Sequence, residues 1–186
     1  IKGIIPDMSN AVGKDVTLES PTDKPGCFAL YIPREKRRVL RYGDFRADWQ
    51  PYRHSHLAFA LGENASGGVV CDLEEMPHLL IGGSTGSGKS VLLNSIIMTM
   101  LKRNLVVDTV RFVMIDPKGV ELTVYNGIPQ LMLPVVTDSW TAVEVLERLC
   151  AVMDERYEVL ERNGVRDLKE LETIGKTMER IVVVID

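Results

Sequence analysis

The segment Gly83–Ser90 restricts the fold of this chain more than any other feature. It reads Gly-Ser-Thr-Gly-Ser-Gly-Lys-Ser and fits the pattern G-x-x-x-x-G-K-[ST] at every fixed position. A short apolar run, His78–Ile81, precedes it, and apolar residues recur at helical density from Ser90 to Arg103. This order predicts a strand, a glycine-rich turn and a helix, with the N–H groups of the turn forming a nest for phosphate oxygens at the helix N-terminus.

The residue types in this turn divide the work of holding a nucleotide. Lys89 is expected to reach the β- and γ-phosphates of ATP as a point charge, and the Ser90 hydroxyl is expected to ligate a bridging Mg²⁺ ion. An empty glycine-rich turn is the alternative, and the strand and helix on either side make it the weaker one. The predicted ATP contacts are Gly83, Ser84, Thr85, Gly86, Ser87, Gly88, Lys89, Ser90 and Val91.

An acidic metal ligand is predicted at the other end of the domain. Ile181–Ile185 is an unbroken apolar run, typical of a buried parallel strand, and Asp186 follows it directly. Many core strands end in aspartate, so the run alone is a weak signal. Together with the phosphate loop it indicates a Walker B element, because ligands of open α/β sheets bind at the carboxyl ends of the strands. Asp186 is therefore predicted to be catalytic alongside Lys89 and to share Mg²⁺ with Ser90.

The chain changes character near residue 55. Residues 1–55 hold several prolines among short apolar pieces such as Phe28–Ile32, which predicts a small mixed α/β lobe with short strands. Residues 56–186 alternate between strand and helix patterns, which predicts a parallel sheet with flanking helices. Two further strands are expected, at Val110–Ile115 and, with a weaker pattern, at Leu131–Val136.

The most regular helical pattern runs from Ser139 to Asn163 and stops before Gly164. Apolar residues three and four positions apart predict one buried stripe, and the charged residues on the other face are typical of a solvated surface. The predicted buried residues are Val143, Leu146, Leu149, Met153, Tyr157 and Leu160.

Composition limits what the chain can bind. Its 22 Lys and Arg residues oppose 26 Asp and Glu residues, a net charge of −4, which excludes a polybasic nucleic-acid binder. Residues 34–53 are a local exception with a net charge of +4, from seven basic and three acidic residues. A contact with the DNA backbone or with another subunit explains this cluster, and so does the charged edge of a solvated hairpin. Its basic residues are Arg34, Lys36, Arg37, Arg38, Arg41, Arg46 and Arg53.

Other chemistries find little support in the sequence. Three cysteines match no paired metal or redox spacing, which favours a reducing compartment, and no apolar run reaches the roughly 20 residues that span a bilayer. The chain begins at Ile1 without a signal-peptide pattern and closes on Asp186, so we expect a soluble piece of a longer polypeptide. The residues considered are Cys27, Cys71 and Cys150, and, for a zinc site that fits no known spacing, His54, His56, Cys71 and His78.

Three blocks of the sequence closely resemble the motor of the FtsK/SpoIIIE family of DNA translocases. They are His78–Ser90 (HLLIGGSTGSGKS), Arg111–Leu122 (RFVMIDPKGVEL) and Gly127–Asp138 (GIPQLMLPVVTD). The resemblance covers roughly residues 57–186, and residues 28–42 are similar, less firmly, to the lobe that precedes the motor. It implies an α/β fold: a RecA-like P-loop ATPase lobe, broken off after the Walker B strand.

The same resemblance implies a function. Motors of this family assemble into hexameric rings, thread double-stranded DNA through the pore and move it by ATP hydrolysis in chromosome partition and cell division. They are cytoplasmic domains of bacterial proteins, many of which are anchored in the inner membrane by other parts of the polypeptide. Type VII secretion ATPases, which move proteins, and conjugation or phage DNA-transfer ATPases resemble the same family and remain as alternatives. A small-molecule kinase would need an acceptor pocket and a lid, for which the sequence offers no sign.

Two departures from the family pattern concern the end of the sequence. Family members follow the Walker B aspartate with a catalytic glutamate, whereas this sequence closes on Asp186, so we expect it to bind nucleotide better than it hydrolyses it. The second departure is that, in RecA-like sheets, a strand from later in the sequence lies between the phosphate-loop strand and the Walker B strand.

The residues Asp116, Pro117 and Lys118 leave a further choice open. They hold either a charged group that senses the γ-phosphate or an aspartate that shapes a turn.

Overall fold

The computed structural model describes residues 2–19, 28–33, 39–64, 66–105 and 109–186. The chain divides into two compact units, Ile1–Arg41 and Tyr42–Asp186. The sequence placed a domain boundary at residues 55 and 56, whereas residues 42–55 lie in the second unit. There, Arg103 Nη2 donates hydrogen bonds to the carbonyl oxygens of Tyr52 and Ser55, at 2.7 and 3.1 Å.

The first unit contains one helix and one short pair of strands. α1 spans Ile5–Val12, and β1 (Thr17–Glu19) pairs antiparallel with β2 (Ala29–Tyr31). The prediction of short strands in this part of the chain is confirmed. Four basic residues of the cluster lie outside the described residues, namely Arg34, Lys36, Arg37 and Arg38, and so does Cys27.

Two parallel strands form the centre of the second unit. β5 (Val110–Ile115) and β6 (Arg180–Ile185) pair along their whole length, which confirms both predicted strands. The continuous strand predicted at Leu131–Val136 is wrong: only its two end residues form parallel bridges, to Phe112 and Ile115. Pro134, in the middle, has no N–H to donate to a ladder.

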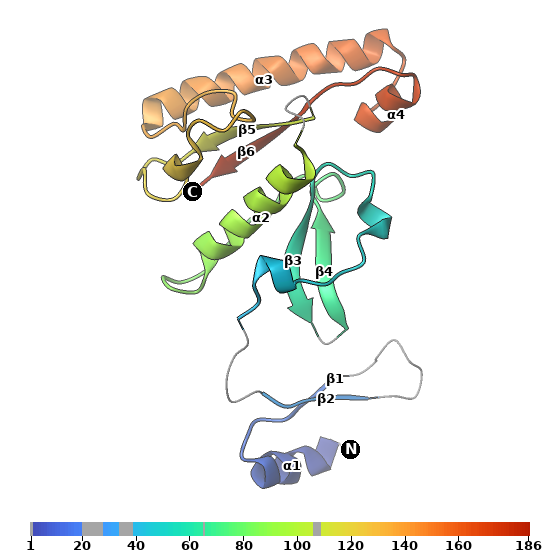
Figure 1. The fold of residues 1–186 in the computed structure, drawn as a ribbon, viewed down its shortest axis with the longest axis vertical. Helices are drawn as coiled ribbons and strands as arrows, with labels where there is room; N and C mark the ends of the chain where they lie inside the picture. Colours follow the sequence, from blue (N-terminus) through green and yellow to red (C-terminus); the bar gives the residue numbers. More distant parts are fainter. Residues whose placement is uncertain (1, 20–27, 34–38, 65, 106–108) are drawn as a thin grey trace. The chain divides into compact units, whose positions relative to one another are not determined.

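Helix α2 (Lys89–Arg103) lies between this sheet and a β-hairpin (Figure 1), and it confirms the predicted helix. The hairpin consists of β3 (Ala58–Asn64) and β4 (Gly67–Asp72), which are antiparallel. One apolar core joins all three layers, because Phe59 of β3, Ile97 of α2 and Phe112 of β5 are each at most 1% exposed and belong to the same cluster. This core fixes α2, and with it the glycine-rich loop, against the sheet.

Helix α3 (Ser139–Arg162) runs along the β5–β6 sheet on the side away from α2 (Figure 1), and α4 (Leu168–Thr173) follows it. The extent of α3 confirms the prediction, but its predicted buried stripe is largely wrong. Leu160 is buried, whereas the side chains of Val143, Leu146, Met153 and Tyr157 are exposed. Ala142 packs on Ile115 and Val136 instead, because the helix carries a second apolar stripe and the sheet receives that one.

The strand predicted at His78–Ile81 is wrong for this structure, since the segment pairs with no other strand in the described part of the chain. Leu80 is 96% exposed. A groove of about 540 Å³ separates the segment from β6 and Asp186, and Ile96 and Met100 of α2 also line it. Within the described residues, His78–Ile81 therefore has no neighbouring strand to pair with, although its composition is that of a strand.

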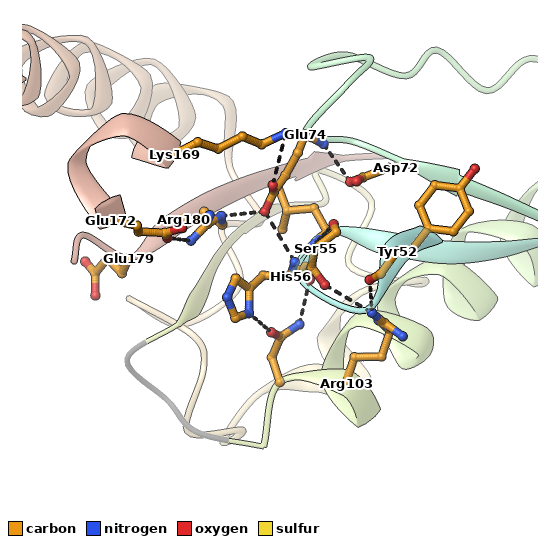
Figure 2. A network of polar contacts seen from close by, with 12 residues as sticks. Tyr52, Ser55, His56, Asp72, Glu74, Arg103, Lys169, Glu172, Glu179 and Arg180 are labelled. Carbon is orange, nitrogen blue, oxygen red and sulfur yellow. Dashed lines mark hydrogen bonds and ion pairs between the residues drawn. The ribbon is translucent and has the colours of Figure 1, made fainter. Parts of the chain in front are cut away.

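A network of charged side chains ties the hairpin, α4 and β6 together (Figure 2). Arg180, at the start of β6, donates from Nε to Glu74 Oε1 at 2.6 Å and lies 2.9 Å, through Nη1, from Glu172 Oε1 of α4. Lys169 Nζ lies 3.8 Å from the other oxygen of Glu74. The side chains of Arg180 and Glu74 are only 6% and 9% exposed, so this is a buried ion pair.

None of the described helices combines the length and the apolar character that a membrane crossing requires. The remaining described elements are short 3₁₀ helices. The 3₁₀ helices span Lys2–Ile4, Tyr42–Asp44, Gln50–Tyr52 and Thr123–Tyr125.

Candidate functional site

The glycine-rich loop is exposed and leads directly into the first turn of α2. Gly86 and Gly88 have φ values of 78° and 99°, in the left-handed region that favours glycine. A Cβ on Gly83 would lie 2.3 Å from Ser87 Oγ, so a larger residue at this position would displace the Ser87 side chain. No side chain of the described residues caps the start of α2, which leaves its first N–H groups free to bind an anion.

Lys89 and Asp186 meet although they are far apart in the sequence. Lys89 Nζ donates to Asp186 Oδ1 at 2.5 Å, and the two side chains are 39% and 7% exposed. The hydrogen bond to Asp186, followed by the attraction of its charge, raises the pKa of Lys89 above 10.5. Lys89 is therefore a cation at neutral pH. The structure brings together the two residues that the sequence predicted to be catalytic.

Ser90, the predicted metal ligand, contacts a residue that the sequence analysis missed. Its Oγ donates to Glu121 Oε1 at 2.8 Å. Glu121 lies in the loop after β5, within the block Arg111–Leu122 that carries the family resemblance. No local pattern links positions 90 and 121. The one available signal was that each residue lies in a block that resembles the FtsK/SpoIIIE motor.

Asp116 is fully buried, and its carboxylate organises the loop that carries Glu121. Burial, the largest single influence, raises the pKa of Asp116, but hydrogen bonds from four backbone N–H groups together hold it below 3.8. Three of these groups are at 2.8–2.9 Å and belong to Gly119, Glu121 and Leu122; the fourth belongs to Lys118. Of the two roles left open by the sequence, this geometry favours the aspartate that shapes a turn.

The histidines considered for a zinc site and the described residues of the basic cluster make other contacts. No group of three or more His, Cys, Asp and Glu side chains among them is placed to hold a metal ion by itself. His56 Nδ1 is 3.0 Å from Asn104 Oδ1, and His54 Nε2 accepts from Arg53 Nε at 2.8 Å. Arg46, from the basic cluster, donates to the carbonyl oxygens of Gly43 and Phe45.

The arrangement has the parts that a nucleotide–metal site needs. A flexible-backbone loop at an uncapped helix N-terminus attracts phosphate, and Lys89 adds a positive charge beside it. A hydroxyl and a carboxylate, from Ser90 and Asp186, are the oxygen ligands that Mg²⁺ prefers alongside substrate phosphates and water. The residues present therefore fit Mg·ATP, with Glu121 as an additional carboxylate next to Ser90.

Comparison with known proteins agrees with this site. The model of the FtsK/SpoIIIE family matches residues 45–185. The DNA translocase FtsK of Staphylococcus aureus is 37% identical over 185 residues, and that of Lactococcus lactis subsp. cremoris is 41% identical over 159 residues. These matches cover 93% and 83% of this chain but only 23% and 20% of the relatives, so the chain spans about a fifth of their length.

A solved structure has the same fold. The pCW3 conjugation coupling protein TcpA, in its monomer form with ATPγS, matches 100% of this chain and 50% of its own length, with a TM-score of 0.65 and 25% identity. The parallel sheet with its flanking helices is thus the fold of a P-loop ATPase lobe, as predicted. The loop, the ion pair that faces it and the match over residues 45–185 lead to one conclusion: the chain belongs to the FtsK/SpoIIIE family.

Proposed function

We propose that this chain is the ATP-binding part of a double-stranded DNA translocase that moves DNA in chromosome partition and cell division. The observation that carries the proposal is the geometry of the phosphate loop: Lys89 lies near its end, at the start of α2, and donates a hydrogen bond to Asp186, directly after β6. The DNA translocases that resemble the chain supply the substrate class.

In this proposal the phosphates of ATP take the place of the Asp186 carboxylate, the hydrogen-bond partner of Lys89 in the structure. Residues Gly83–Val91 bind the phosphates through backbone N–H groups, and Lys89 exchanges Asp186 for the β- and γ-phosphates. Ser90 and Asp186 would hold Mg²⁺, which supplies neutralising charge to the phosphates when it is bound. Because Asp186, whose side chain is only 7% exposed, exchanges one cation for another, its charge is not left buried and unpaired.

The assembly around this site is also a proposal. We assign residues 56–186 to the N-terminal part of a RecA-like ATPase domain and residues 1–55 to a small lobe that precedes it, of which residues 42–55 belong to the same compact unit as the ATPase domain. The domain works in the cytoplasm as one subunit of a homo-oligomeric ring, expected to be a hexamer. Attachment to the bacterial inner membrane, as in FtsK-type proteins, would come from other parts of the full-length protein.

The test is ATP hydrolysis by the full-length protein with and without linear duplex DNA. We expect duplex DNA to increase the rate, and the increase to weaken as salt rises from about 50 to about 200 mM, because phosphate contacts release counterions. A protein substrate that stimulates hydrolysis while duplex DNA does not would contradict the proposal and favour the secretion ATPases.

A second candidate is a conjugation coupling ATPase, which the structural match to TcpA favours. Both candidates use ATP and DNA, so a biochemical rate does not separate them. Deletion of the gene does: trapped chromosomes at division septa support the partition function, whereas loss of plasmid transfer with normal septa supports the coupling function.

A further inference from the structure

The hydrogen bond between Ser90 and Glu121 concerns the predicted metal ligand itself. Ser90 lies in the first turn of α2, and its Oγ donates to Glu121 Oε1 at 2.8 Å. Asp186, the other predicted ligand, is engaged with Lys89 at 2.5 Å. Glu121 is thus the carboxylate that holds the Ser90 hydroxyl in this structure, while Asp186 holds the lysine.

The direction of this hydrogen bond matters for metal binding. A serine hydroxyl has one hydrogen to donate and two lone pairs, and a metal ligand must turn a lone pair toward the cation. An ionised carboxylate only accepts hydrogen bonds, so it fixes the hydroxyl hydrogen on the side of Glu121. Both lone pairs of Ser90 Oγ then remain free, and the neighbouring negative charge makes the oxygen a better donor to a metal.

The fold places Glu121 by means that do not involve Ser90. Asp116 Oδ2 accepts the backbone N–H groups of Glu121 and Leu122 at 2.8 and 2.9 Å, and the Leu122 side chain is completely buried in the core. Since the backbone N–H of Glu121 is hydrogen-bonded to Asp116 and the next residue, Leu122, is buried in the core, the Glu121 carboxylate reaches α2 from a backbone position that the fold itself sets.

A second contact aligns the same loop with the same turn of α2. Tyr125 Oη donates to Asn94 Oδ1 at 2.5 Å, and Asn94 Nδ2 donates to the carbonyl oxygen of Ser90 at 2.9 Å. The loop therefore holds Ser90 at two points, through its hydroxyl and, by way of Asn94, through its backbone. Such a double attachment is expected where the orientation of a side chain matters.

We propose that Glu121 is a positioning residue of the nucleotide–metal site, which accepts the hydroxyl hydrogen of Ser90 so that Ser90 Oγ presents a lone pair to Mg²⁺. The inference rests on the proposed function, because it assumes that the loop binds Mg·ATP. It assigns no contact between Glu121 and the reacting atoms.

The experiment measures binding of ATPγS to the full-length protein at increasing Mg²⁺ concentrations and in EDTA. Glu121→Ala should raise the Mg²⁺ concentration for half-maximal binding about 10-fold, at the lower end of the effect of losing a residue that orients a metal ligand. In EDTA its affinity for ATPγS should stay equal or increase, because a negative charge near the phosphates is removed. Glu121→Gln keeps a carbonyl oxygen that accepts the hydrogen and should retain most of the Mg²⁺ response.

Two controls identify the cause of any change. In a Ser90→Ala background, Glu121→Ala should have no further effect on the Mg²⁺ response, because Glu121 acts through the hydroxyl. Glu147→Ala, on the exposed face of α3, should match the wild type. Equal loss of affinity with and without Mg²⁺ would overturn the inference and show that Glu121 only supports the fold.

The remaining outcomes separate the inference from the proposed function. A wild type that binds Mg·ATPγS, together with a Glu121→Ala variant of unchanged Mg²⁺ response, would overturn the inference alone. A wild type that binds ATPγS neither with nor without Mg²⁺ would overturn the proposed function on which it rests. If Glu121→Ala fails to fold, Glu121→Leu, which fills similar space but accepts no hydrogen bond, takes its place in the wild-type and Ser90→Ala backgrounds.

Discussion

Replacement of Lys89 with alanine is expected to weaken ATP binding about 100-fold. Lys89 is a cation at neutral pH, because its hydrogen bond to Asp186 raises its pKa. Hydrogen bonds that involve a charged group contribute about 1.5–3 kcal/mol each, so losing contacts to two phosphates costs about 3 kcal/mol. That free energy corresponds to a factor of about 100 in Kd.

The measurement is a titration of ATP and ADP binding to wild-type and Lys89→Ala protein in the presence of Mg²⁺. ADP lacks the γ-phosphate, so the variant should lose less affinity for ADP than for ATP. Lys176→Ala is the matched control, because this lysine lies on the surface and donates to Asn163 instead. Unchanged ATP affinity in the Lys89→Ala variant would contradict the assignment of the phosphate loop.

Replacement of Arg180 with methionine is expected to reduce the free energy of unfolding by about 3 kcal/mol, the lower end of the typical result of removing one partner of a buried ion pair, because Lys169 remains near Glu74. Arg180 and Glu74 have side chains that are only 6% and 9% exposed, so Glu74 would stay buried next to Lys169, whose Nζ is 3.8 Å away. The pair joins β6 to the hairpin (Figure 2), and the loss should therefore affect the whole second unit.

Thermal or urea unfolding of the variant measures this loss. Arg166→Met is the matched control: Arg166 pairs with Glu170 on the surface and is 88% exposed, so its replacement should cost less than about 1 kcal/mol. Adding Glu74→Leu to Arg180→Met should restore much of the stability, because an apolar pair leaves no unpaired charge in the interior. Equal losses for Arg180→Met and Arg166→Met would contradict this account of the network.

The sequence alone predicted the helices and strands whose local signals are strong. The bounds of β5, β6, α2 and α3 follow from apolar runs and helical periodicity, and the structure confirms those of β5 and places the others within one residue of the prediction. The phosphate loop could be predicted because the sequence shows glycines where the turn needs left-handed backbone conformations, as at Gly86 and Gly88. Lys89 and Asp186 were predicted from two separate motifs, and the fold alone shows that they contact each other.

Other features depend on contacts that a sequence does not display. His78–Ile81 has the composition of a strand, but a strand also needs a partner to pair with, and among the described residues this segment pairs with none and lines a groove beside β6. The buried stripe of α3 was misassigned because two apolar stripes compete for the sheet. Glu121 was missed because tertiary structure alone brings its loop to Ser90.

The most direct test of the account is movement along duplex DNA driven by ATP. A third DNA strand, bound as a triplex to one end of a linear duplex, is displaced when a motor reaches it, and release of a label on that strand reports the movement. The account predicts displacement by the full-length wild-type protein with ATP and Mg²⁺, and none by its Lys89→Ala variant. ATP hydrolysis by the wild type without displacement on any duplex would contradict it.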